Sequence, residues 1–253
     1  MSSHFMADTA TLTGRTTRHI TRSLDTILTT ALMPIAMMLL FVFVFGGAID
    51  TGSQNYVDYM LPGILLITIA SGISYTAFRL FTDLQSGIID RFATMPIARS
   101  ATLWSHVITT MLAILVSLLV VLGVALLIGF RSPAGPPAWL GVAGITGLFA
   151  LALTWVAVIP GLTARTTDGA VAFSYPLIFL PFVSSAFVPT ASMPGPVRWF
   201  AENQPVTPIV NSIRDLLGGQ PVDSGIWIAL AWCLGVLLVA YVVAMVVYRR
   251  RIG

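Results

Sequence analysis

The sequence from residue 103 to residue 129 reads LWSHVITTMLAILVSLLVVLGVALLIG and contains no acidic residue, lysine or arginine. A helix needs about 20 apolar residues to cross the roughly 30 Å of hydrocarbon in a bilayer. This stretch is longer than that, so it predicts a transmembrane helix that is tilted or that extends into water at one end.

Five further apolar stretches are long enough to cross a bilayer. With the first they give six predicted spans, at approximately 27–47, 60–80, 103–129, 139–162, 170–188 and 226–248. The fifth is short and contains Pro176 and Pro181, which lack the backbone donor of a regular helix, so we expect a kink there. The predicted fold class is an all-α integral membrane protein with six transmembrane helices, in a single domain of residues 1–253.

The composition of the whole chain fits a bilayer rather than water. Of the 253 residues, 57% are hydrophobic and 9% are charged, and the mean hydropathy is +0.90. Soluble domains carry about 25% charged residues, which keep them dispersed. We therefore expect a multi-pass protein of the cytoplasmic membrane, with the lipid bilayer as a partner and no nucleic-acid partner.

The arginines predict the orientation. Ten of the 13 basic residues fall on one side of the predicted spans, namely Arg15, Arg18, Arg22, Arg79, Arg91, Arg99, Arg165, Arg249, Arg250 and Arg251. The other side holds Arg131, Arg198 and Arg214. Because positively charged loops stay in the cytoplasm, both termini are predicted to be cytoplasmic.

The chain contains no lysine, and this excludes one kind of chemistry. A P-loop needs a lysine on the β- and γ-phosphates of ATP. Any ATP-driven work must come from another subunit, so we expect no cofactor on this chain and ATP with Mg²⁺ on a partner. The single cysteine, Cys233, excludes an internal disulfide.

No catalytic or metal-binding pattern is present in the sequence. His4, His19 and His106 are scattered, and none has a carboxylate at the spacing of a metal ligand. We expect His106, near the start of the third span, to have a role in packing or at the membrane interface rather than in catalysis. No carboxylate lies in the middle of a span, which argues against ion-coupled transport.

The N-terminal residues 11–26 mix apolar residues with three early arginines. This pattern predicts a helix that lies in the cytoplasmic membrane interface, with arginines toward anionic headgroups. A disordered basic tail that only sets the topology is the alternative.

The connection between the second and third spans predicts a short cytoplasmic helix. Thr82-Asp83-Leu84-Gln85 has the pattern of a capping box, so a helix is expected to begin near Thr82, and Pro96 ends it. Apolar residues recur on one face: Leu84, Ile88, Ile89, Phe92 and Met95. Such a helix suits a groove in another protein or the headgroup layer, and the pattern alone leaves both open.

The connection from residue 189 to residue 224 predicts one or two short helices on the outer side. Thr207 is a candidate N-cap, Pro208 suits the first helical position and Gly218 suits the end. These helices are expected either to dip into the outer leaflet or to lie on its surface.

Mildly polar and aromatic side chains within the second and fifth spans form a candidate substrate path. They are Ser71, Ser74, Tyr75, Phe78, Phe173, Tyr175 and Phe179. Rings and hydroxyls together suit amphipathic molecules, and ordinary helix packing is the alternative. In the fourth span we expect Gly141, Gly144 and Gly147 to mark a close helix contact rather than a site.

The segments outside the bilayer resemble those of one known family, the permease subunits of type-2 ABC exporters, in the branch of the daunorubicin-resistance permeases. In that family an acidic residue after the second span precedes a glycine, an acidic–basic pair, an apolar residue and a proline. The corresponding residues here are Asp83, Gly87, Asp90, Arg91, Phe92 and Pro96, followed by Arg99. The family more often has Glu at two of the acidic positions and Leu where Phe92 stands.

The outer half follows the family's order as well. The matching residues are Phe187-Val188-Pro189, Met193-Pro194, Ala201-Glu202-Asn203-Gln204-Pro205, Thr207, Arg214 and Gly218-Gly219. The resemblance covers the whole chain, including the six-helix layout.

The resemblance implies a permease that works as a pair, with a second copy or a homologue, bound to two ATP-binding subunits. The residues implied for ATPase coupling are Asp83, Leu84, Gly87, Ile88, Asp90, Arg91, Phe92, Met95 and Pro96. Substrate would leave between the two permeases, near the second and fifth spans. The implied activity is export of small hydrophobic or amphipathic compounds of the drug or antibiotic type. The alternatives are export of lipid or polysaccharide, a non-transporting membrane scaffold and, more remotely, a membrane enzyme.

Overall fold

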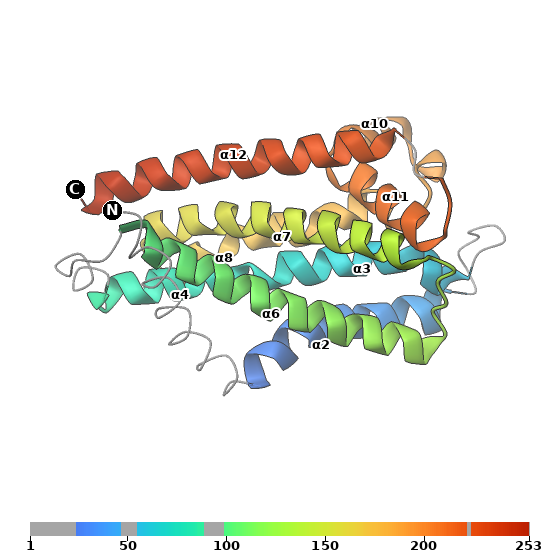
Figure 1. Cartoon of the computed structure of the whole chain (residues 1–253), viewed down its shortest axis with the longest axis horizontal. Coiled ribbons are helices and arrows are strands. Elements are labelled where there is room, and N and C mark those ends of the chain that lie inside the picture. Colours follow the sequence, from blue (N-terminus) through green and yellow to red (C-terminus); the bar gives the residue numbers. More distant parts are fainter. Residues whose placement is uncertain (1–23, 47–54, 89–98, 222–223, 253) are drawn as a thin grey trace.

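A computed structural model describes residues 24–46, 55–88, 99–221 and 224–252, and within these ranges every regular element is a helix. The long helices lie side by side along one axis (Figure 1). At one end of the molecule, called here the α4–α6 end, α4 (Ser74–Gln85) ends, α6 (Arg99–Ile128) begins and α12 (Gly225–Ile252) ends. The opposite end, called here the α10–α11 end, holds α10 (Gly195–Asn203) and α11 (Val206–Leu217).

Among the described residues, four helices are long and apolar enough to cross a membrane, by their length and composition. They are Tyr56–Gln85, which combines α3 (Tyr56–Gly72) with α4, Ala101–Ile128 in α6, Pro136–Thr163, which is α7, and Gly225–Arg251 in α12. They coincide with the predicted spans at 60–80, 103–129, 139–162 and 226–248, which confirms an all-helical protein with several apolar helices.

The first and fifth predicted spans correspond to shorter apolar helices, Ala31–Val44 and Thr167–Val183. The first consists of the C-terminal part of α2 (Leu24–Leu40) and most of a π-helical segment, Phe41–Phe45. The six-span count and the orientation of the termini remain predictions. Residues 11–23 of the predicted interfacial helix lie outside the described residues.

The predicted kink in the fifth segment is confirmed as a series of breaks. The segment consists of α8 (Thr167–Ala172), α9 (Ser174–Phe179) and a 3₁₀ turn, Leu180–Val183. Pro176 cannot donate to the carbonyl of Ala172, four residues earlier, and α8 ends there. Pro181 falls in the 3₁₀ turn, after which Ser184 is extended.

The core is divided between the two ends of the bundle, and α7 runs through both parts. Near the α4–α6 end, the fully buried Trp155 makes edge-to-face contacts with Trp104, at 5.2 Å between ring centroids, and with Tyr241, at 4.8 Å. Leu80, Leu103, Val107, Val158, Leu162, Ala240, Ala244 and Tyr248 complete this cluster, called here the inner cluster. Two edge-to-face contacts stabilise the packing of α6, α7 and α12 beyond the apolar area that the rings bury, and they favour one arrangement of these helices.

Glycines allow the closest helix contacts, but not all of those predicted. A Cβ on Gly161 would lie 3.2 Å from the Ala77 backbone, so α7 and α4 approach closely there. A Cβ on Gly141 would meet Leu216 at 3.1 Å, which confirms a close contact at that residue. The same prediction is wrong for Gly144 and Gly147, since no atom of the described residues lies within 4 Å of a Cβ on either.

Two predicted helix starts are wrong, both because a threonine hydroxyl bonds to a helix that already exists. Thr82 lies in the last turn of α4 and donates to the carbonyl of Phe78 at 2.9 Å instead of capping a new helix. Thr207 lies inside α11, which begins at Val206 with Pro205 as its N-cap, and donates to the carbonyl of Ala201. Hydroxyls bond in this way to preceding carbonyls as readily as they cap. The predicted end of α11 at Gly218 is confirmed.

Candidate coupling and transport surfaces

The helix α4 ends in a turn that is completed by Gly87. The Ser86 amide donates to the carbonyl of Thr82 at 3.0 Å, and the Gly87 amide donates to that of Leu84 at 3.2 Å. Gly87 has φ of +69°, and a Cβ there would meet no atom of the described residues within 4 Å. Glycine is therefore required by the left-handed backbone and not by lack of space.

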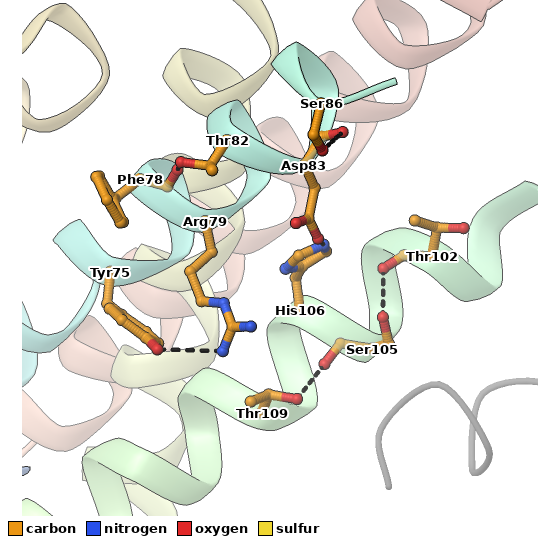
Figure 2. A network of polar contacts seen from close by, with 10 residues as sticks. All are labelled: Tyr75, Phe78, Arg79, Thr82, Asp83, Ser86, Thr102, Ser105, His106 and Thr109. Carbon is orange, nitrogen blue, oxygen red and sulfur yellow. Dashed lines mark hydrogen bonds and ion pairs between the residues drawn. The ribbon is translucent and has the colours of Figure 1, made fainter. Parts of the chain in front are cut away.

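Asp83, in the last turn of α4, faces His106 on α6 (Figure 2). The Nε2 atom of His106 lies 3.3 Å from Oδ2 of Asp83. The His106 side chain is 5% exposed and that of Asp83 is 29% exposed. A buried imidazole is costly without a partner, and the Asp83 carboxylate supplies one. The sequence predicted a packing role for His106 and did not pair it with Asp83, because the pairing depends on how two helices cross.

A second polar contact joins the same two helices deeper in the bundle. The hydroxyl of Thr76 donates to that of Thr110 at 2.6 Å, and both side chains are buried. Since α4 and α6 are antiparallel, the contact of Asp83 with His106 and that of Thr76 with Thr110 are successive links along one interface. We call these two contacts the α4–α6 ladder.

The predicted coupling residues are described only in part. Leu84 is half-buried and packs against the inner cluster, and Gly87 and Ile88 follow the end of α4. Asp83 and Leu84 thus belong to α4 rather than to a separate helix. Asp90, Arg91, Phe92, Met95 and Pro96 lie outside the described residues, so the amphipathic helix stays a prediction.

The two segments of the predicted substrate path are neighbours, because α8 packs on α4 and α9 packs on α3. Three of their rings are exposed: Phe78 at 40%, Tyr175 at 59% and Phe179 at 64%. Ser71, Ser74, Tyr75 and Phe173 are half-buried. The Nη1 atom of Arg79 donates to the Tyr75 hydroxyl at 3.1 Å (Figure 2). We call this set, with Arg79, the aromatic face.

A separate apolar cavity of about 410 Å³ lies between α6 and α7. Leucines of α6 and small residues of α7 dominate its lining, and Trp104 and Trp139 also line it. None of the predicted path residues does so. The hydroxyl of Thr146, which also lines it, already donates to the carbonyl of Val142 at 2.6 Å, so the cavity offers a ligand little beyond hydrocarbon contact.

At the α10–α11 end, Arg214 ties three segments together. Its Nη2 atom donates to the carbonyl of Tyr59 at 3.0 Å and to that of Ser185 at 2.8 Å, and its Nη1 donates to Oδ1 of Asn211 at 2.8 Å. The guanidinium carbon lies 3.8 Å from the centroid of the Tyr59 ring. Burial lowers the pKa of the Arg214 guanidinium from its usual value, yet arginine stays charged in proteins.

Thr207 in α11 and Gln204, just before this helix, form hydrogen bonds with the same irregular stretch, residues 183–187. The side-chain Nε2 atom of Gln204 donates to the carbonyl of Val183 at 3.1 Å. The hydroxyl of Thr207 accepts from the backbone amide of Ser185 at 3.3 Å. Because these residues break from helical geometry, their backbone groups need partners from elsewhere. Gln204, Thr207 and Arg214 supply them, a role that the sequence did not predict for any of the three. We call these contacts the α11 staple.

Among the described residues, no group of three or more His, Cys, Asp or Glu side chains is placed to hold a metal ion. The ladder and the staple are built to position helices, and the aromatic face is exposed.

Comparison with known proteins identifies the class. Residues 8–217 match the model of the ABC-2 type transporter family, so the chain belongs to that family. It is therefore a multi-pass transmembrane subunit of an ABC transporter, whose ATP hydrolysis belongs to a partner ATP-binding subunit. This confirms the resemblance to type-2 ABC permeases and the prediction that the motor is on another chain.

Individual relatives narrow the branch. The chain is 30% identical to the daunorubicin resistance ABC transporter permease protein DrrB1 of Streptomyces coeruleorubidus, over 87% of this chain and 78% of that protein. It is 28% identical to the probable doxorubicin resistance ABC transporter permease protein DrrC of Mycobacterium tuberculosis, over 97% of this chain and 90% of that protein. ABC transporter G family member 20 of Dictyostelium discoideum is 24% identical, over 74% of this chain but 27% of that protein.

Proposed function

We propose that this chain is the permease subunit of an exporter that moves hydrophobic or amphipathic compounds of the drug or antibiotic type out of the cell. Two permeases, identical or homologous, would work with two ATP-binding subunits that carry ATP and Mg²⁺. The whole chain would form one domain of six spans in the cytoplasmic membrane, with both termini and the α4–α6 end in the cytoplasm. The names of two relatives, the daunorubicin resistance and the probable doxorubicin resistance permease proteins, support the class of substrate.

The aromatic face is the observation that carries this proposal. Arg79 lies six residues before the end of the helix Tyr56–Gln85, on the side proposed to be cytoplasmic, and its Nη1 atom donates to the Tyr75 hydroxyl at 3.1 Å. Its neighbours on the surface are a hydroxyl-bearing ring, Tyr75, and the exposed ring of Phe78. Such a surface suits a second permease and an amphipathic molecule between the two, because rings and hydroxyls can bind both apolar and polar parts of a substrate.

The proposal is tested with the chain and its co-purified ATP-binding subunit in proteoliposomes, by ATP-dependent uptake of a fluorescent anthracycline into inverted vesicles. We expect uptake by the wild type and a loss of about fivefold to tenfold in Phe179→Ala or Tyr75→Ala, the size of one lost aromatic contact. Leu127→Ala is the matched control, since Leu127 on α6 is 88% exposed but lies outside the aromatic face.

Three results would decide against parts of the proposal. Transport of a lipid or polysaccharide in place of the anthracycline would overturn the substrate class. Binding of the ATP-binding subunit without transport of any of these would favour a scaffold. Equal losses in Leu127→Ala and Phe179→Ala would overturn the assignment of the aromatic face.

A further inference from the structure

We propose that Asp83 and His106 are positioning residues for coupling: their contact makes α4 and α6 move as one unit when the connection between them is displaced. The inference rests on the proposed function, because it concerns how motion of a partner ATPase enters the chain. Neither family resemblance nor sequence pattern pairs these two side chains.

The contact lies at the base of the connection. Residues 83 and 106 are 23 positions apart, and between them the chain leaves α4 and enters α6. Yet Nε2 of His106 and Oδ2 of Asp83 are 3.3 Å apart (Figure 2). A force on the connection therefore reaches both helices at a point where they are already tied together.

The chemistry of the pair suits a permanent tie. A carboxylate accepts from Nε2 of a neutral histidine whose proton is on that nitrogen, and it accepts from the same atom of an imidazolium. The contact therefore does not depend on one protonation state of His106. Because the His106 side chain is 5% exposed, water competes little for its ring nitrogen, which strengthens the contact.

The pair also connects to the body of the protein on both sides. The second link of the ladder, Thr76 with Thr110, holds the same helices deeper in the bundle. On α6, Leu103 and Val107 flank His106 and belong to the inner cluster. Motion of the α4 end would thus pass through Asp83 and His106 into α6, α7 and α12, instead of separating α4 from them.

Loss of the pair should therefore uncouple rather than unfold. Without it, α4 and α6 keep the link of Thr76 with Thr110 and the apolar contacts of Leu80 and Leu84, so the bundle persists. The last turn of α4 would then be free to separate from α6 when the connection is displaced, and ATP would be hydrolysed without productive movement.

The experiment measures anthracycline molecules transported per ATP hydrolysed, with the complex in proteoliposomes. We expect Asp83→Ala and His106→Ala each to lower this ratio about fivefold, with the double variant no worse than either, as for two groups that act through one contact. The exchange variant, Asp83→His with His106→Asp, is expected to restore at least half of the ratio. Ser105→Ala is the matched control, because this buried hydroxyl next to His106 donates within α6, to the carbonyl of Thr102 at 2.7 Å.

The outcomes separate the inference from the proposed function. A wild-type complex that transports nothing overturns the proposed function and the inference together. A transporting wild type with unchanged single variants, with additive losses in the double variant or with no restoration in the exchange variant overturns the inference alone. If the alanine variants do not accumulate in the membrane, Asp83→Asn and His106→Gln replace them, and the same criteria apply to the ratio per assembled complex.

Discussion

Replacement of Arg214 by alanine is expected to destabilise the protein severely. The arginine donates to the carbonyls of Tyr59 and Ser185 and to Oδ1 of Asn211, at 2.8 to 3.0 Å through its terminal nitrogens, and it lies over the Tyr59 ring. Hydrogen bonds from a charged group contribute about 1.5–3 kcal/mol each. Ser185 keeps one donor, the Tyr59 hydroxyl at 3.1 Å, so the loss is smaller than the sum of the bonds. We therefore expect a cost of about 3–5 kcal/mol.

Thermal unfolding of the purified permease in detergent measures this cost. For a chain of this length about 1 kcal/mol shifts the midpoint by 2–4 °C, so Arg214→Ala should unfold roughly 6–20 °C below the wild type. Arg214→Lys should lie between them, since one ammonium group cannot reproduce the planar, forked geometry of the guanidinium.

Arg198→Ala is the control for loss of an arginine at the same end of the molecule. Arg198 pairs with Glu202 at 2.8 Å on the surface of α10, and its side chain is 49% exposed. Surface pairs of this spacing contribute about 0.3–0.5 kcal/mol, so the midpoint should move by no more than about 2 °C. If Arg214→Ala lowers the midpoint no further than Arg198→Ala does, Arg214 does not act as the tie described here.

Three other substitutions, one of them with a control, test particular contacts. A Cβ on Gly63 would lie 2.6 Å from Cβ of Ala186, so Gly63→Val should lower the thermal midpoint, whereas Gly147→Ala, which meets nothing within 4 Å, should leave it unchanged. Gly87→Ala should cost about 1 kcal/mol, because φ of +69° is unfavourable for a residue with a Cβ, and a neutral result in thermal unfolding would contradict that backbone assignment. Phe92→Asp should reduce co-purification of the ATP-binding subunit, since it places a charge on the apolar face of the predicted coupling helix; undiminished co-purification would count against docking through that face.

Hydrophobic length was enough to predict the four longest helices, but not where each ends. A membrane span is defined by about 20 apolar residues, a property of the sequence alone. The end of α4 depends on whether Thr82 caps a new helix or bonds back to Phe78, and both use the same residue types in the same order. The kink in the fifth segment was predictable because Pro176 and Pro181 act on their own backbone.

The polar contacts of the α4–α6 ladder and the α11 staple were not predictable. Each joins segments that are distant in the sequence and meet only in the fold. Tyr59 and Arg214 are 155 positions apart, and no local pattern relates them. Arg214 was singled out by its place in the order of family residues, and for His106 only a role in packing or at the interface was expected. In both cases the residue type was informative, since a buried charge or imidazole needs a partner, but the identity of the partner required the fold.

The helix formed by α3 and α4 takes part in both the α4–α6 ladder and the α11 staple, so the two sets of contacts act on the same helix. Asp83 at its end belongs to the α4–α6 ladder, and the carbonyl of Tyr59 near its beginning accepts from Arg214 in the α11 staple. With a rise of 1.5 Å per residue, these two residues are about 36 Å apart along the helix axis. Phe78 and Tyr75 of the aromatic face lie between them on the same helix. A displacement of the α4 end would therefore tilt the surface proposed to meet substrate, while the staple holds the far end of the helix against α11.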